Sequence, residues 1–205
     1  MRLLGGGCLL LAGAGLAVGY FRQSLTAPVS SDGAATVLQA RAMLHGNPLL
    51  GHWWLTDVSF YTTELPEYVL VEAVRGLSPV VVHICGAITW TLTVLLAALA
   101  ARGRETGRAG LARALVAGGI LLAPGINGAL LAPGITGAAE VFLENPDHAG
   151  TAVPVLLLLV ILDLGPARWP TAAVVGLLLA WAQVADLLTV VAATAPVAAV
   201  AALRL

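Results

Sequence analysis

Long apolar runs alternate with shorter polar segments along this chain. The runs occupy residues 3–20, 80–101, 114–131, 151–164 and 169–203. A helix needs about 20 apolar residues to cross the hydrocarbon core of a bilayer, which is about 30 Å thick. The last run is too long for one crossing, so we expect it to divide near Asp186. The pattern therefore predicts an all-α fold, a polytopic transmembrane helix bundle of about six spans. In the third span, Pro124 and Gly125 are expected to kink or end the helix.

Composition and charge support the membrane class. The chain has 205 residues, of which 59% are hydrophobic and 10% are charged, and its mean hydropathy is +0.93. Soluble globular proteins carry about 25% charged residues. The net charge of −1 and the lack of a basic stripe argue against a nucleic-acid partner. We expect residues 1–205 to form a single integral membrane domain with membrane lipid as a partner.

The distribution of arginine predicts the orientation of the bundle. If the N-terminus is cytoplasmic, seven of the ten basic residues lie on the cytoplasmic side: Arg2, Arg102, Arg104, Arg108, Arg113, Arg168 and Arg204. An excess of basic residues marks cytoplasmic loops, so we expect a multi-pass protein of the cell membrane with its N-terminus inside. Nine of the eleven acids then fall outside, mainly in a first outer loop, residues 21–79, and a second outer loop, residues 133–150.

The first outer loop is long enough to hold interfacial helices. Asp32 stands after two serines and is expected to cap a helix over residues 34–45, which Gly46-Asn47-Pro48 would end. A second helix is expected in the stretch "TELPEYVLVEAVRGL", lying along the membrane interface. Its acids, Glu64, Glu67 and Glu72, are interpreted as a solvated face.

The second outer loop gathers four groups that can bear charge, namely Glu140, Glu144, Asp147 and His148. Such a group can offer a general acid or base, a metal site, or a contact for a cationic substrate. No metal site is expected, because there is one histidine and no H-x-x-x-H or C-x-x-C spacing. Structural interpretations stay open as well: Asp147 in a turn after proline, and His148 as an interfacial residue without a partner.

Over residues 1–165 the order of these features resembles a known family. A short anchor precedes a long outer loop with an early acid and "ARAMLHGNPLL", then a span, an arginine-rich turn, a span and an acidic outer loop. This order is similar to the N-terminal part, or a truncated member, of the polytopic membrane glycosyltransferases with the type C fold. The dolichyl-phosphate-mannose protein mannosyltransferase-like branch is the nearest in pattern, with Asp32, Ala42 and Gly46 at matching positions.

The resemblance implies an activity and roles for particular residues. Such enzymes transfer a sugar from a polyprenyl-phosphate carrier to an acceptor on the outer side of the membrane, and no cofactor is expected. Asp32 would be the catalytic base, with helix capping as its structural alternative. Asp147, with Glu144 and His148 beside it, would help to position the donor or the acceptor.

Two arginines of the first outer loop are candidates for binding the donor phosphate. The guanidinium of Arg41 or Arg75 can meet two phosphate oxygens at once. The alternative class is a non-enzymatic polytopic membrane protein, either an assembly partner or a small transporter subunit. A transporter is expected to hold an ionisable group near the bilayer midplane, and no predicted span has a charge deep within it. Acids outside the spans favour the transferase.

Overall fold

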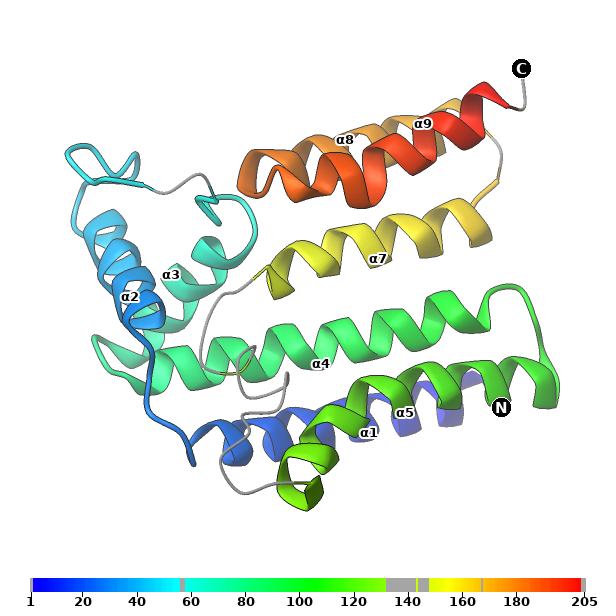
Figure 1. Cartoon of the computed structure of the whole chain (residues 1–205), viewed down its shortest axis with the longest axis horizontal. Coiled ribbons are helices and arrows are strands. Elements are labelled where there is room, and N and C mark those ends of the chain that lie inside the picture. Colours follow the sequence, from blue (N-terminus) through cyan, green and yellow to red (C-terminus); the bar gives the residue numbers. More distant parts are fainter. Residues whose placement is uncertain (1, 56–57, 132–142, 144–147, 167, 204–205) are drawn as a thin grey trace.

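The computed structural model describes residues 2–55, 58–131, 143, 148–166 and 168–203, and this part of the chain is all-α, as predicted. Long helices lie side by side and alternate in direction along the chain (Figure 1). They are α1 (Arg2–Ser24), α4 (Val80–Arg102), α5 (Gly107–Leu131), α7 (Ala149–Leu164) and α8 (Trp169–Ala185). A π-helical turn, η1 (Val190–Thr194), continues into α9 (Ala195–Ala202), which runs in the direction opposite to α8 (Figure 1).

Helix α4 is the centre of the bundle and packs against α1, α3, α5 and α7. None of its 23 residues is an aspartate or a glutamate. The helix ends before Gly103, whose positive φ of 57° is favourable for glycine. At 1.5 Å per residue the helix is about 34 Å long. Among the described residues, α4 is the one helix both long and apolar enough to cross a membrane, and 61% of its most apolar window is buried inside the protein.

The predicted interruptions of the apolar runs meet different outcomes. The break near Asp186 is confirmed, because α8 ends at Ala185 and helical structure resumes at Val190. At Pro124 the helix does not end: α5 continues to Leu131, and its last turns bend away from its axis in Figure 1. A proline inside a helix removes one backbone hydrogen bond, which explains a bend without a stop.

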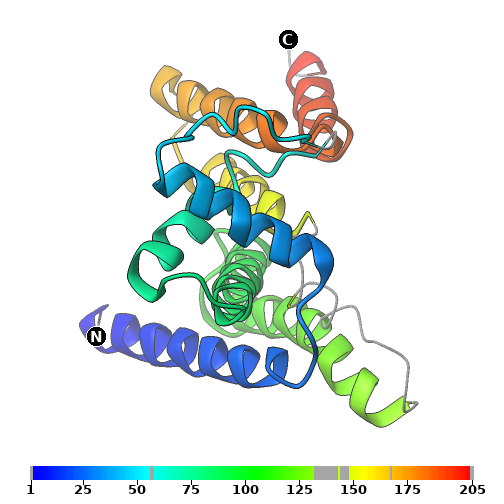
Figure 2. The ribbon, with the colours of Figure 1, turned by 90° about the vertical axis from the view of Figure 1, so that its left-hand side faces the viewer.

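Two shorter helices, α2 (Ser31–Leu44) and α3 (Glu64–Arg75), lie across one end of the bundle. Figure 2 is viewed from this end and shows them in front of α4, which is seen nearly along its axis. Leu65 and Tyr68 of α3 are buried with Val37 of α2 and with Val81 and Val82 of α4. Each fully buried side chain of this size contributes about 1.5–3 kcal/mol. The structure thus has helices in both stretches of residues 21–79 where the sequence predicts them.

The capping residue of α2 differs from the one predicted. The Ser30 hydroxyl accepts a hydrogen bond from the Gly33 amide at 3.0 Å, and Ser30 has extended backbone angles. Asp32 already lies within the first helical turn and is exposed. Helix α2 therefore begins three residues earlier than expected, and the prediction that Asp32 caps it was wrong. Asp32 stabilises α2 only as a negative charge near the helix N-terminus.

Substituting Ser30 tests this assignment. We expect Ser30→Ala to destabilise the first turn of α2 by about 1 kcal/mol, because an amide loses its side-chain acceptor. Asp32→Ala should cost only a few tenths of a kcal/mol, since it removes an exposed charge from the helix dipole. Amide hydrogen exchange of residues 31–36 measures both effects. Faster exchange in Asp32→Ala than in Ser30→Ala would restore Asp32 as the cap, because alanine cannot cap a helix.

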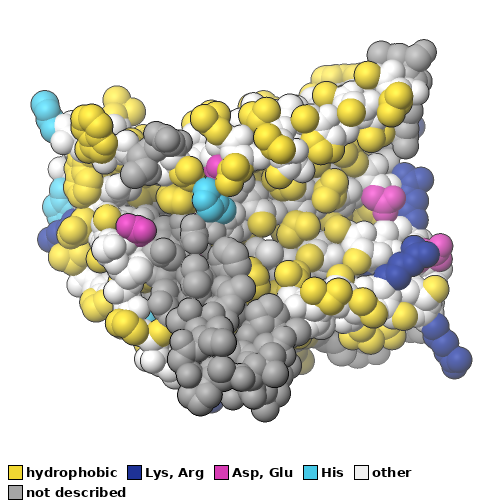
Figure 3. All heavy atoms as spheres, viewed as in Figure 1, with side chains coloured by type: hydrophobic (Ala, Val, Ile, Leu, Met, Phe, Trp, Pro, Cys, Tyr) yellow, Lys and Arg dark blue, Asp and Glu magenta, His cyan; other side chains and the backbone are white. Residues whose placement is uncertain are grey.

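The two ends of the bundle differ in charge. Arg104 donates to the backbone oxygen of Asp163 at 2.5 Å, which joins the α4–α5 turn to the α7–α8 turn. Most of the arginine side chains in Figure 3 lie at this end, and α2 and α3 lie at the opposite one. Between the ends the surface is largely hydrophobic (Figure 3), with exposed side chains that include Leu115, Ile120, Leu159, Leu177, Val184 and Val191.

Candidate functional site

Buried carboxylates gather where α3 and α7 begin and α8 ends. Glu64 at the start of α3 is 2% exposed, and Asp186 just after α8 is 1% exposed. Glu72 is buried as well, and Glu67 lies on the same inner face. The interpretation of these α3 acids as a solvated face was wrong, because α3 turns them toward the bundle and leaves apolar Leu70 exposed.

Glu64 caps the N-terminus of α7. Its Oε1 accepts a hydrogen bond from the Gly150 amide at 2.9 Å, and its Oε2 accepts one from the Thr63 hydroxyl. The first amides of a helix lack partners within the helix and favour a nearby negative charge. Burial raises the pKa of Glu64, the bonds from Thr63 and Gly150 oppose this shift, and the charge of Asp186 adds to it.

Glu67 lies one helical turn further along α3. Its Oε2 accepts a hydrogen bond from the Thr89 hydroxyl of α4 at 2.7 Å, and its buried Oε1 has no hydrogen-bond partner among the described residues. Burial and, to a smaller extent, the charge of nearby Glu64 raise the pKa of Glu67 to about 7, although the hydrogen bond from Thr89 opposes the shift. Glu67 therefore exchanges a proton near neutral pH, where most glutamates are ionised.

His148 and Asp186 form a hydrogen-bonded pair beside these glutamates. The Nδ1 atom of His148 lies 2.5 Å from Oδ2 of Asp186, and the other Asp186 oxygen accepts from the Leu188 amide at 2.9 Å. The histidine side chain is 39% exposed whereas the carboxylate is 1% exposed. Phe60 contacts the imidazole edge to face, with ring centroids 6.0 Å apart. A buried carboxylate that orients a reachable imidazole suits general acid–base chemistry.

These contacts decide between the interpretations left open for His148. It is not a residue without a partner, because it pairs with Asp186. Asp186, near which the sequence predicts a break between helices, has an almost fully buried side chain. The two residues are 38 positions apart, so no local pattern could have joined them.

The segment before α3 holds the end of α8 in place. The backbone amides of Ser59 and Phe60 both donate to the Ala185 oxygen, at 3.1 and 3.4 Å. Thr62 exchanges two hydrogen bonds with Trp181, one from its hydroxyl at 2.7 Å and one to its backbone oxygen. Asp186 is thereby held by the segment before α3 as well as by α8.

The remaining predicted site residues lie apart from this cluster or outside the described chain. Glu144 and Asp147 lie outside the described residues. Asp32 is exposed on α2, where its carboxylate lies 3.5 Å from the Ser31 hydroxyl. Arg41 of α2 forms an ion pair with buried Glu72 of α3 at 3.5 Å, and Arg75 is exposed at the end of α3. These contacts of Asp32 and Arg41 stay within α2 and α3, whereas His148 bonds to the segment after α8.

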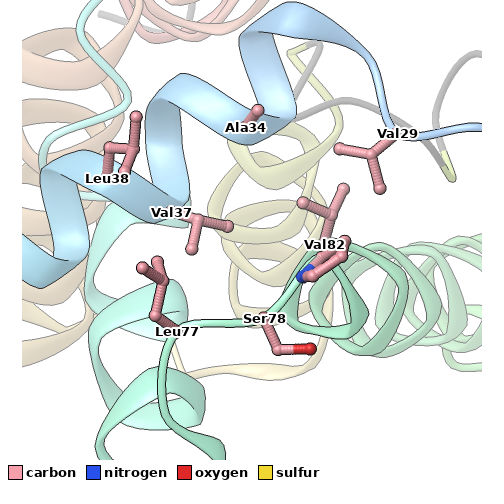
Figure 4. A pocket seen from close by; sticks show the side chains of 8 residues that line it. Val29, Ala34, Val37, Leu38, Leu77, Ser78 and Val82 are labelled. Atoms are coloured by element: carbon pink, nitrogen blue, oxygen red, sulfur yellow. The ribbon is translucent and has the colours of Figure 1, made fainter.

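An apolar groove lies along one face of α2. It has a volume of about 320 Å³ and lies between α2 and the α3–α4 connection. In Figure 4 the side chains of Val37, Leu77 and Val82 point into it from three segments, and Ser78 is its polar member. The groove thus offers a hydrocarbon surface at this end of the bundle.

Neither metal geometry nor similarity to known proteins assigns a role to these residues. In the part of the chain that the structure describes, no group of three or more His, Cys, Asp or Glu side chains is placed to hold a metal ion. No family model matches the chain, and no curated protein and no solved structure is significantly similar to it.

Proposed function

We propose that this chain is a polytopic integral membrane protein whose arginine-rich end is cytoplasmic. Successive long helices alternate in direction, so the α4–α5 and α7–α8 turns come to the same end (Figure 1). The lateral surface between the ends exposes many large apolar side chains, which in water would be a liability. Helices α7 and α8 have 16 and 17 residues, so they need a thinned bilayer or flanking residues to complete a crossing.

The protein's proposed activity is transfer of a sugar from a polyprenyl-phosphate carrier to an acceptor at the outer end of the bundle. The observation that carries this proposal is the His148–Asp186 pair, which lies at the end opposite the arginine-rich turns. A carboxylate that holds an imidazole in one orientation is the arrangement that removes a proton from a hydroxyl.

In this reaction the acceptor oxygen forms a bond to the anomeric carbon while the bond from that carbon to the phosphate oxygen breaks. A base takes the acceptor proton, and the polyprenyl phosphate leaves with the bond electrons. His148 is one candidate base, and Asp32, which the family resemblance implies, is the other. Arg75 is the better candidate for the phosphate, because Arg41 already neutralises Glu72. The groove along α2 suits an isoprenoid chain, since its walls are apolar.

Turnover by purified protein in lipid tests the proposal and separates the two bases. With a polyprenyl-phosphate-linked sugar as donor, we expect loss of the true base to slow turnover about 100-fold or more. His148→Gln and Asp32→Asn are compared, with Glu105→Gln as a matched loss of charge at the arginine-rich end, where turnover should not change. If His148 is the base, Asp186→Asn should also lower turnover and shift its pH profile.

The outcomes of this comparison are distinct. Loss of turnover in Asp32→Asn alone would place the base on α2, as the family resemblance implies. No turnover by folded wild-type protein with any polyprenyl donor would overturn the proposal. The alternative of a non-enzymatic assembly partner or small transporter subunit would then be preferred.

A further inference from the structure

A cavity of about 290 Å³ lies between α3, α4, α7 and α8, on the inner side of the carboxylate cluster. Most of its wall is apolar, with Leu92 from α4, Pro154 and Leu157 from α7, and Leu178 from α8. Trp181 adds an indole ring to the wall. Polar members gather on one side, where α3 and the start of α7 meet: Thr62, Thr63, Glu67, Thr89 and Gly150.

The neutral polar groups of this cavity are already used inside the protein. The hydroxyls of Thr62, Thr63 and Thr89 donate to Trp181, Glu64 and Glu67, respectively. The Gly150 amide and the Trp181 indole N–H also have acceptors within the protein. A ligand rich in hydroxyl groups would find few free partners here, and unpaired buried hydroxyls cost about 1–3 kcal/mol each.

What the cavity does offer is negative charge next to an apolar and aromatic wall. Glu67 lines the cavity, Glu64 bonds to Gly150 at its edge, and neither lysine nor arginine is among the described lining residues. This charge repels phosphates and carboxylates. A bare metal ion would lack ligands, because most of the wall is hydrocarbon. A cation that carries alkyl groups suits both parts of the wall. Its charge is attracted by the carboxylates, and its alkyl groups pack against the apolar side chains and the indole, as quaternary ammonium groups pack against aromatic rings.

We propose that this cavity is a binding site for a small organic ammonium ion, with the Glu67 carboxylate facing the charge and Trp181 and the aliphatic wall enclosing the alkyl groups. The cavity has the size of pockets that take small ligands. This proposal rests on the cavity and is independent of the proposed transferase activity.

Binding should depend on pH, because the neutral form of Glu67 offers no charge. The pKa of Glu67 is about 7, so the site gains its charge as the pH rises through that value. The ionisable groups around it are Glu64, Tyr68, Cys85, Asp186 and His148.

Choline is a suitable probe, because its uncharged analogue with a tert-butyl group in place of the trimethylammonium has nearly the same shape. Calorimetry on the protein in lipid nanodiscs, with empty nanodiscs subtracted, measures both ligands. At about pH 8.5 we expect choline to bind about tenfold or more tightly than the analogue, and to lose about tenfold on lowering the pH to about 5.5. Glu67→Gln should bring choline down to the affinity of the analogue, whereas Glu105→Gln should leave both unchanged.

Binding of the neutral analogue reports whether the cavity survives the substitution. If the Glu67→Gln variant still binds the neutral analogue and also binds choline as tightly as the wild type does, the proposal is overturned. If the variant loses both ligands, the pH profile of the wild type decides, and a choline affinity that does not rise with pH overturns the proposal. Absence of choline binding to the wild type overturns it too.

Discussion

Replacing Gly150 with alanine is expected to lower the stability of this protein by about 3 kcal/mol or more. A Cβ atom at Gly150 would lie 2.2 Å from Cδ and 2.6 Å from Oε1 of Glu64. These atoms cannot coexist, so the Glu64 carboxylate must leave the α7 amide that it caps. Overpacking costs about 1–3 kcal/mol, and a buried carboxylate without its partners adds to that cost. Thermal unfolding in lipid or detergent measures the loss as a lower Tm.

Gly176→Ala is the matched control for this substitution. Gly176 lies in α8, and a Cβ atom there would have no neighbour within 4 Å, so alanine should be neutral or slightly stabilising. The double variant Gly150→Ala, Glu64→Ala removes the carboxylate that collides and should recover part of the loss at Gly150. Equal melting temperatures of Gly150→Ala and wild type would show that α7 and Glu64 are not in contact.

The helices could be predicted because each is encoded by a continuous apolar run or a local end signal. The apolar run at residues 80–101 forms α4, and Gly46 follows the end of α2, as expected. The break near Asp186 was foreseen from length alone, since residues 169–203 are too many for one helix to cross one bilayer. Capping was the weaker inference, because Ser30 and Asp32 both suit an N-cap and only the backbone angles distinguish them.

The candidate site could not be predicted, because its contacts join segments far apart in sequence. Glu64 and Gly150 are separated by 86 positions, and His148 and Asp186 by 38. On sequence alone an acid-rich amphipathic helix at a membrane surface turns its charges to water, which is the common case. Here the Thr89 hydroxyl of α4 and the Gly150 amide of α7 offer hydrogen bonds inside the bundle, and Glu67 and Glu64 of α3 turn inward to accept them.

The stability of the protein is expected to fall as the pH rises from about 5 to about 8, and Glu67→Gln is expected to remove much of this dependence. The pKa of Glu67 is about 7, above the value of 4.5 for an exposed carboxyl. As the pH rises, the unfolded chain therefore releases the Glu67 proton at a lower pH than the folded protein does. The contribution of Glu67 to the free energy of unfolding is fully present below about pH 4.5. It is lost by the time Glu67 ionises in the folded protein near pH 7, a loss of about 3 kcal/mol.

Glutamine at position 67 keeps the acceptor for the Thr89 hydroxyl but never carries charge, so its melting temperature near pH 8 should exceed that of the wild type. Glu64 also has a raised pKa, so a shallower decline with pH should persist in the variant. Glu105→Gln removes an exposed acid at the other end and should follow the wild-type profile. A Glu67→Gln variant with the wild-type pH profile would mean that Glu67 is ionised throughout, with its charge matched by a group that the folded chain brings to its unpaired Oε1. A cation in the adjoining cavity would have that same effect, so the two profiles are compared in buffers free of organic amines.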